Sequence, residues 1–131
     1  MNEIIFNNKT YARIIDLNNI EEGLNFYSND DEYVQVGTWN YQEGKILDKH
    51  YHNYFERSSY RTSEAVLVLK GEIECSIFTE DNNFIWKGLI TKNHLIIQLQ
   101  GAHEYKIIKN AKILEIKNGP YFGPEKDRTR I

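Results

Sequence analysis

His50 and His52, two histidines separated by one residue, have the type and spacing most suggestive of chemistry in this sequence. Alternation along a β-strand would direct both imidazoles to one face and Tyr51 to the other. Two imidazoles on one face can bind a metal ion, although a polar edge strand with surface histidines has the same pattern. The choice between these interpretations depends on the other candidate ligands.

Two residues later in the chain extend this candidate set. Glu64 opens the apolar run 64–69, where an unpaired carboxylate would be costly to bury, so we expect it to be paired, metal-bound or exposed at the strand end. His103 follows Gly101 at a predicted strand boundary and is either a third ligand or a loop histidine. Cys75 is the only cysteine, which excludes an internal disulfide and a multi-cysteine zinc site.

The elements that position these side chains are predicted to be β-strands. Nine Tyr, six Phe and two Trp, together with many Ile, favour strands over helices. Ile73, Cys75 and Ile77 alternate with polar residues before a turn at 81–83, which predicts a hairpin with one apolar face. Turn-forming residues separate eight strand-like runs. These are Tyr33–Trp39, Lys45–His52, Ala65–Leu69, Glu72–Phe78, Phe84–Leu89, Leu95–Leu99, Glu104–Ile108 and Lys112–Ile116.

Eight short strands without a helical period between them predict an all-β sandwich or closed barrel. The 131 residues correspond to a single domain. Residues 1–30 are expected to form an N-terminal edge segment, in which 14–24 holds either a short helix or irregular edge structure. Residues 118–131 contain both prolines and should form an ordered arm without repeating structure.

The histidine pair and Glu64 resemble the first motif of the cupin family. That motif runs Gly, five residues, His-x-His, three or four residues, Glu, six residues and Gly. The matching positions are Gly44, His50, His52, Glu64 and Gly71. Eleven residues separate the second histidine from this glutamate, which indicates a lengthened loop.

Glu56 competes with Glu64 for the place of the motif's acid. It matches the short interval after His52, but no glycine follows it at the expected spacing. The β pattern and the glycine after Glu64 therefore favour Glu64.

The second cupin motif, Gly-x5-Pro-x-Gly-x2-His-x3-Asn, is more divergent here. Gly101 is retained, Asn93 and Leu99 replace the first glycine and the proline, His103 comes one residue early, and Ile107 replaces the last Asn. Asn adopts positive φ more readily than other non-glycine residues, so it is a tolerable substitute. More narrowly, the chain is similar to small single-domain bacterial cupins associated with surface-polysaccharide or sugar-nucleotide gene sets.

The resemblance implies a cupin jelly-roll barrel, a double-stranded β-helix, over residues 1–131. It also implies one divalent metal ion bound by His50, His52, Glu64 and His103. Imidazole and carboxylate ligands suit Zn, Mn, Fe, Ni or Co. Four protein ligands would leave a position for water or substrate, so the ion would act as a Lewis acid.

A metal-dependent enzyme acting on a small polar, carbohydrate-related metabolite is therefore the expected function, with isomerisation or epimerisation as the reaction. The alternative is a non-catalytic cupin that binds a sugar or small effector, with or without metal. A third interpretation is a purely structural β domain. The expected proton-carrying residues are Glu115, Lys117 and Tyr105, and the expected substrate-binding residues are Arg57, Arg61, Tyr54 and Tyr60.

Charge and hydropathy limit the expected partners. The net charge is −3 with both signs mixed along the chain, so no basic surface indicates nucleic acid. Apolar runs are far shorter than the ~18 residues of a membrane-spanning helix. No signal-like segment opens the sequence, and with one cysteine this favours a cytoplasmic location. Exposed strand edges and many aromatics suggest a homodimer.

Overall fold

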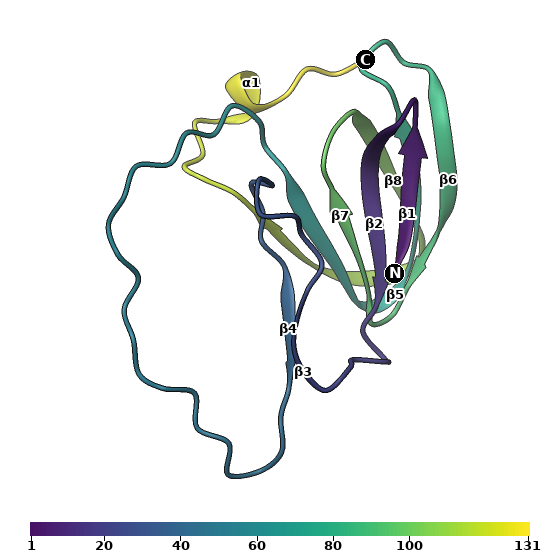
Figure 1. Cartoon of the computed structure of the whole chain (residues 1–131). Helices are drawn as coiled ribbons and strands as arrows, with labels where there is room; N and C mark the ends of the chain where they lie inside the picture. The colour runs from purple at the N-terminus through teal and green to yellow at the C-terminus, as the bar shows by residue number, and fades with distance from the viewer.

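The structure, a computed structural model, describes residues 1–131 and is 50% strand and 3% helix. A strongly curled antiparallel sheet forms a half-barrel, and a separate two-stranded sheet accompanies it (Figure 1). The all-β prediction is confirmed, and the sheet is an open half-barrel. The elements are β1 (Asn2–Phe6), β2 (Lys9–Asp16), β3 (Gly23–Phe26), β4 (Gly37–Asn40), β5 (Glu64–Phe78), β6 (Phe84–Thr91), β7 (His94–Gln98), β8 (Ala102–Lys117) and α1 (Pro124–Asp127).

Strand β5 organises the large sheet. The strand order is β1-β2-β7-β5-β6, and β8 also pairs with β5. The first part of β5 lies between β7 and β8, so that Glu64 pairs with both Gln98 and Lys117. The second part lies between β6 and β8. Polar residues from three strands therefore meet at the start of β5.

Strands β5 and β8 each span two runs that the sequence predicts as separate short strands. The predicted turn at Gly71 is instead a bend within β5, with φ +81 at this glycine and register shifts against β8 around it. A Cβ at Gly71 would lie 2.2 Å from the carbonyl oxygen of Asn110. Glycine therefore permits both the left-handed backbone and the close approach of β8, and the sheet bends without ending.

Two apolar clusters lie on opposite faces of the large sheet, because alternate residues of β5 contribute to each. The predicted apolar face of Ile73, Cys75 and Ile77 is confirmed, with each side chain at most 1% exposed. The larger cluster is Ile4, Ala12, Val66, Val68, Ile73, Cys75, Ile77, Ile90 and Ile96. The smaller cluster is Ile15, Val34, Ala65, Leu95 and Ile97.

The N-terminal residues form an antiparallel hairpin with one register shift, between Ile4 and Ile5. The prediction of a helix or irregular structure over 14–24 is therefore wrong for residues 14–16, which belong to β2. Asn7 and Asn8 connect β1 to β2 with φ values of 49° and 58°. Two positive φ values match the turn that a right-twisted two-residue hairpin needs, and Asn tolerates them. The hairpin joins the large sheet through pairing of β2 with β7.

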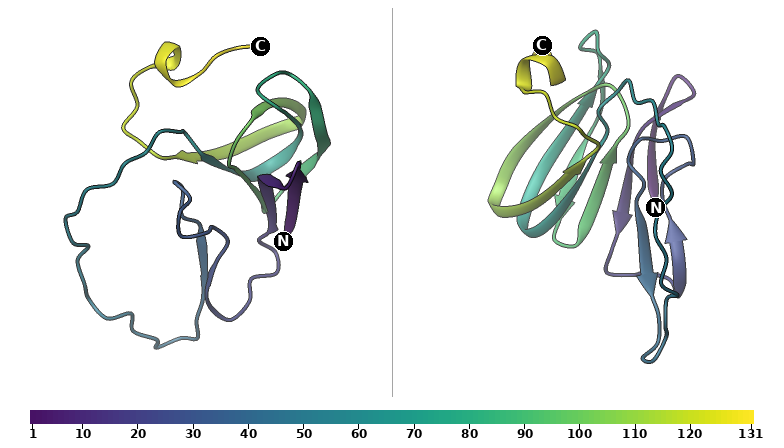
Figure 2. Two further views of the ribbon diagram at one scale, coloured as in Figure 1. Left: turned by 45° about the horizontal axis from the view of Figure 1, so that its top comes forward. Right: turned by 90° about the vertical axis from the view of Figure 1, so that its left-hand side faces the viewer.

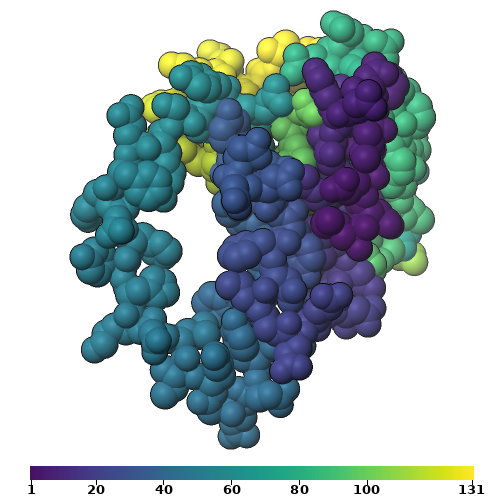
Figure 3. Space-filling view, in the orientation of Figure 1, coloured from purple at the N-terminus to yellow at the C-terminus, as the bar shows by residue number.

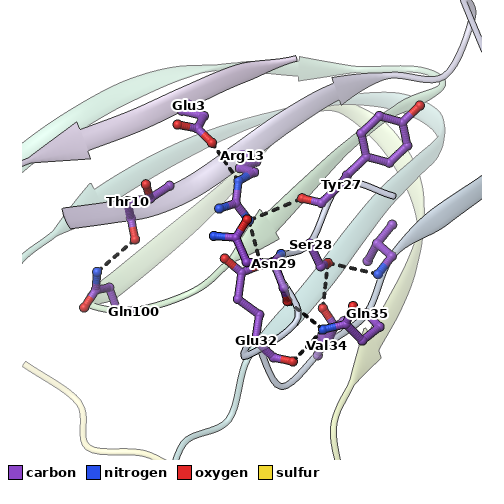
Figure 4. A network of polar contacts seen from close by, with 11 residues as sticks. Glu3, Thr10, Arg13, Tyr27, Ser28, Asn29, Glu32, Val34, Gln35 and Gln100 are labelled. Atoms are coloured by element: carbon purple, nitrogen blue, oxygen red, sulfur yellow. Dashed lines mark hydrogen bonds and ion pairs between the residues drawn. The ribbon is translucent and has the colours of Figure 1, made fainter. Parts of the chain in front are cut away.

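Arg13 of β2 is 3% exposed and connects this hairpin to the loop after β3 (Figure 4). Its Nε donates to Glu3 Oε1 at 2.9 Å, and its Nη1 donates to Glu32 Oε2 at 2.6 Å and to the Tyr27 carbonyl oxygen at 3.3 Å. A buried guanidinium needs such partners. The network therefore links β1, β2 and the loop that precedes β4.

Residues 41–63 contain no strand, so the predicted strand Lys45–His52 is wrong. The segment loops away from the half-barrel (Figures 1 and 2) and stands apart from it in the space-filling view (Figure 3). Its apolar residues Ile46 and Tyr51 are exposed, and no neighbouring strand pairs with it. Alternation alone does not make a strand that lacks both a partner and a buried face.

Residues 118–131 contain one short helix, α1, where the sequence predicts no repeating structure. The arm is joined to the end of segment 41–63, because Ser63 N–H donates to Asn118 Oδ1 and the Thr62 hydroxyl donates to Asp127 Oδ1, both at 2.8 Å. These bonds place the arm beside the start of β5.

Candidate functional site

Glu64 and His103 form the closest acid–imidazole contact in the structure, with 2.9 Å between Glu64 Oε1 and His103 Nε2. Glu64 begins β5 and His103 lies near the start of β8, opposite Ile77 at the other end of β5. The curl of the sheet brings these distant positions together. The Glu64 side chain is 12% exposed and the His103 side chain 35% exposed, so the pair is sheltered on one side and accessible on the other.

The charge of Glu64 is stabilised by this contact. Burial alone would raise the pKa of Glu64, but the hydrogen bond from His103 and the positive charges of His103 and Lys117 outweigh it, so the pKa is below its usual value. The carboxylate therefore stays ionised and can orient the imidazole.

Glu115 and Lys117 form a pair next to Glu64. They share one face of β8, and Lys117 Nζ lies 2.6 Å from Glu115 Oε1. The hydrogen bond to Glu115 raises the pKa of Lys117, so this side chain is a stable ammonium. Both residues line a polar hollow rather than the opposite face of the sheet.

This hollow has a volume of about 1010 Å³. Both ends of β5, the turn that follows it, the end of β7, both ends of β8 and the C-terminal arm line this open hollow. Its lining is mostly polar, and its size is that of a site for a small molecule. The charged lining residues are Glu64, Glu80, His103, Glu104, Glu115, Lys117, Asp127, Arg128 and Arg130.

Two uncharged side chains in the lining have buried polar atoms. Gln98 is 4% exposed and its Oε1 accepts no hydrogen bond, and the Tyr105 hydroxyl is buried beside the side chains of Gln98 and Cys75. The Gln98 amide nitrogen faces the Cys75 sulfur at 4.0 Å. Burial raises the pKa of Tyr105 well above its usual value, so its hydroxyl keeps its proton.

The structure does not bring the four predicted metal ligands together. Glu64 and His103 are in contact, whereas His50 and His52 are exposed in segment 41–63. The rings of His50 and His52 are neighbours, 5.3 Å apart, and His50 Nδ1 contacts the Asp48 carbonyl oxygen at 2.9 Å. No group of three or more His, Cys, Asp or Glu side chains is placed to hold a metal ion. As arranged, these residues do not fit a four-ligand site.

The predicted substrate-binding residues also lie in segment 41–63, along with the competing acid Glu56, and all are exposed. Arg57 stacks on the Phe55 ring, with 3.6 Å from its Cζ to the ring centre. Arg61 donates to Gln100 Oε1 at 3.3 Å and, with Tyr60, lines a second hollow of about 520 Å³. Neither Tyr54 nor any of these residues lines the hollow beside Glu64.

Gln98 is the main residue of the site that the sequence interpretation missed. It is a lone polar residue inside the apolar run 95–99, and that contrast was the available signal. The arm residue Asp127 was missed as well, because only the fold brings it to the start of β5 through its bond to Thr62.

Comparisons with protein families, with curated proteins and with solved structures found no match for this chain. The structure also contains no helix long and apolar enough to cross a membrane. The geometry of the site is therefore the basis for inferring a function.

Proposed function

We propose that this protein is an enzyme that moves a proton on a small polar, carbohydrate-related metabolite, in an isomerisation or epimerisation. The contact between Glu64 and His103 beside the polar hollow carries this proposal. A carboxylate that orients an imidazole is a recurrent arrangement for a general base, because it fixes the tautomer and stabilises the protonated ring.

The proposed step begins with His103. Its Nε2 proton is donated to Glu64, which leaves Nδ1 free to accept a proton. His103 removes a proton from the carbon next to a substrate carbonyl, and the C–H electron pair forms a C=C bond as the carbonyl oxygen becomes an enolate. Return of the proton to the former carbonyl carbon, together with transfer of the neighbouring hydroxyl's proton to the enolate oxygen, gives the isomer with a new carbonyl at the adjacent carbon. Return of the proton to the opposite face of the original carbon gives the epimer.

Lys117 supports the same step by its charge. Its ammonium lies on the wall of the hollow and is held by Glu115. A fixed positive charge stabilises an oxyanion more than it stabilises a neutral carbonyl, and this difference lowers the barrier. Lys117 would therefore act on the enolate, while Glu115 holds it in place.

Solvent deuterium tests the proposal. A panel of aldoses, ketoses and nucleotide-linked sugars is incubated with the protein in D₂O, and mass spectrometry measures carbon-bound deuterium. We expect exchange into at least one compound, and a loss of about 10²–10⁴-fold in Glu64→Gln and His103→Gln, the usual contribution of a general base. Glu125→Gln and His94→Gln, which carry the same changes outside the hollow, should keep the wild-type rate.

Other results would redirect the function. Binding of a sugar without exchange would support the non-catalytic binding function instead. Deuterium exchange that persists in both Glu64→Gln and His103→Gln would rule out His103 as the general base.

Metal binding by His50, His52, Glu64 and His103 stays a prediction. The proposed proton transfer uses no metal, because the residues as arranged do not fit one ion. Elemental analysis of the purified protein tests the prediction. One equivalent of a divalent metal that is lost in His52→Ala would support the predicted site, and metal-free wild-type protein that also fails to bind added Zn²⁺ would remove it.

We further propose that the half-barrel is a divergent cupin jelly roll in a cytoplasmic, homodimeric protein. The two glycine-punctuated motifs support the first part, and the single, buried Cys75 suits a reducing compartment. Strand β8 pairs only with β5 and carries exposed Ile108 and Leu114, which supports association through this edge.

A further inference from the structure

The side chain of Asn118 joins the C-terminal arm to the end of segment 41–63, where both lie beside the start of β5 (Figure 1). Its Oδ1 accepts a hydrogen bond from the Ser63 N–H at 2.8 Å. Its Nδ2 donates to Ser59 Oγ at 2.9 Å and to the Arg61 carbonyl oxygen at 3.1 Å. One half-buried side chain therefore holds the last residues of this segment through three hydrogen bonds.

These bonds extend the pairing of β5 with β8 by one step. Glu64 is opposite Lys117 in the register of the two strands, so the next residues outward are Ser63 and Asn118. Ser63 is 3% exposed, and its N–H donates to no main-chain oxygen. A buried N–H needs an acceptor, and here the Asn118 side chain supplies the one that a strand neighbour would provide. Asn118 therefore fixes the main chain immediately before Glu64 and immediately after Lys117.

A carboxamide matches all three partners of Asn118, which a carboxylate does not. The Ser63 N–H needs an acceptor, and the Arg61 carbonyl oxygen needs a donor. Asparagine carries an acceptor and two donors on one carbon. A reversed amide would place its nitrogen against the Ser63 N–H and its oxygen against the Arg61 carbonyl oxygen, so the partners fix its orientation.

Two further hydrogen bonds attach the same stretch of chain, but they join side chains only. The Thr62 hydroxyl donates to Asp127 Oδ1 at 2.8 Å, and Arg61 Nη1 donates to Gln100 Oε1 at 3.3 Å. Both Thr62 and Arg61 are exposed. The bonds of Asn118 are therefore the ones that hold the main chain before β5 against another element.

This main chain carries the charged side chains that the proposed step uses. Glu64 Oε1 lies 2.9 Å from His103 Nε2, within the narrow range of a hydrogen bond. Lys117 is opposite Glu64 and lines the same hollow. A displacement of about 1 Å near the reacting groups can lower a rate about 10²-fold. Asn118 does not line the hollow, so any effect it has on the reaction passes through these neighbours.

We propose that Asn118 is a positioning residue, which holds Glu64 in contact with His103 and beside Lys117 at the wall of the hollow. It touches neither the substrate nor the reacting atoms. This inference rests on the proposed function and deepens it, because it names the residue that keeps the acid–imidazole pair aligned for proton transfer.

Crystal structures of variants measure this alignment without a substrate. Asn118→Ala removes all three hydrogen bonds, and we expect the distance between Glu64 Oε1 and His103 Nε2 to exceed about 3.5 Å, beyond a hydrogen bond. Asn118→Asp loses both donors but keeps the acceptor for the Ser63 N–H, so the distance should stay within about 3.2 Å.

Deuterium exchange into the sugar panel gives a second readout in the same variants. Asn118→Ala should lower kcat about 10- to 100-fold and change KM less than about threefold, because Asn118 does not line the hollow. Asn118→Asp should recover most of this loss. Asn40→Ala is the matched control, because it removes a bond from Nδ2 to a main-chain oxygen, that of Ile20, outside the hollow. It should change neither the distance nor kcat.

Thermal unfolding shows whether each variant is folded at the assay temperature. If Asn118→Ala is not, Ser59→Ala takes its place, since it removes one of the three bonds and leaves Asn118 itself unchanged. We expect it to lower kcat about 2- to 10-fold, the usual effect of one hydrogen bond. An unchanged kcat in this folded variant would count against the inference in the same way as in Asn118→Ala.

A merely structural asparagine would lower Tm and leave the site intact. An unchanged distance between Glu64 and His103 in Asn118→Ala would therefore overturn the inference, and so would an equal loss of kcat in Asn40→Ala. The proposed function fails separately. If the contact is lost in Asn118→Ala but the wild type exchanges no deuterium, the positioning role stands and the proton transfer does not. If exchange needs Glu64 and His103 but is unchanged in Asn118→Ala, the proton transfer stands and the positioning role does not.

Discussion

Single residues around the hollow differ in how their surroundings set their charge. Glu64 is held ionised because His103 outweighs the effect of burial. Cys75 is buried without a nearby cation, and burial together with the negative charge of Glu64 raises its pKa to about 12. The same small region therefore keeps one acid charged and a thiol neutral, which suits Glu64 and not Cys75 for chemistry at neutral pH.

The reactivity of Cys75 is the prediction that follows at this scale. At pH 8 the folded protein should resist iodoacetamide, and labelling should proceed only in denaturing urea. The thiol has a pKa of 9.0 in the unfolded chain and about 12 in the folded protein. As the pH rises through this range the thiol ionises first in the unfolded state, so the contribution of Cys75 to the free energy of unfolding should decline. Rapid labelling of native protein at pH 8, measured by mass spectrometry, would contradict the burial described here.

The sequence identified Glu64 and His103 as two of four candidate metal ligands. It did not predict that these two side chains form a pair without the other two ligands. An acid at the start of an apolar strand has to find a partner, and the structure supplies His103. Gln98 was not recognised as a site residue, because an amide in an apolar run can be assigned to a site only when its neighbours on the adjacent strands are known.

At the scale of elements, β5 depends on a bend that only glycine provides. Gly71→Ala should cost about 1–2 kcal/mol for the left-handed backbone and a further 1–3 kcal/mol, roughly, for the contact with Asn110. Gly44→Ala is the matched control, because Gly44 has φ +88 and a Cβ added there would meet nothing within 4 Å. Urea unfolding should show a clearly larger loss for Gly71→Ala, and equal losses would contradict this account of the bend.

Arg13 provides a second test at the scale of elements. Arg13→Ala would leave Glu3 and Glu32 without their cation, and we expect a loss of about 3 kcal/mol, the lower end for a buried pair because Glu3 is 35% exposed. Arg128→Ala removes an exposed contact with Asp127 and should cost about 0–1 kcal/mol. Thermal unfolding compares the two, and similar losses would show that the Arg13 network does not hold the N-terminal hairpin.

Elements with alternating apolar residues were predictable because the pattern itself reports burial. The hairpin of β5 and β6 follows this rule, with Ile73, Cys75 and Ile77 in the core. Segment 41–63 does not follow it, since the apolar residues of its predicted strand, such as Ile46, are exposed and no strand pairs with it. The β1–β2 hairpin was missed although Asn7 and Asn8 carried its turn signal.

At the scale of the whole molecule, the all-β class could be predicted from residue types, whereas the extent of closure could not. Closure depends on which distant strands pair, and no local pattern encodes the pairing of β5 with β7 and β8. The site follows the same logic. Glu64 and His103 meet because the sheet curls, so their contact is a property of the fold and not of a motif.

The free edge of β8 leads to a prediction about assembly. If two copies associate there, light scattering should give a mass of twice the 15.5 kDa chain. Ile108→Lys with Leu114→Lys should then yield monomers, because both residues are exposed on β8. Ile46→Lys, the same change on segment 41–63, should leave the dimer intact. A wild-type monomer at high protein concentration would remove this proposal.

We propose that the pair of Glu64 and His103, and not the pair of His50 and His52, carries the chemistry. The most direct test compares deuterium exchange, as kcat/KM, in Glu64→Gln and in the double variant His50→Ala with His52→Ala. We expect a loss of about 10²–10⁴-fold in Glu64→Gln and a change of less than about threefold in the double variant, since exposed groups outside the hollow have small effects. A large loss in the double variant with near-wild-type exchange in Glu64→Gln would contradict the claim.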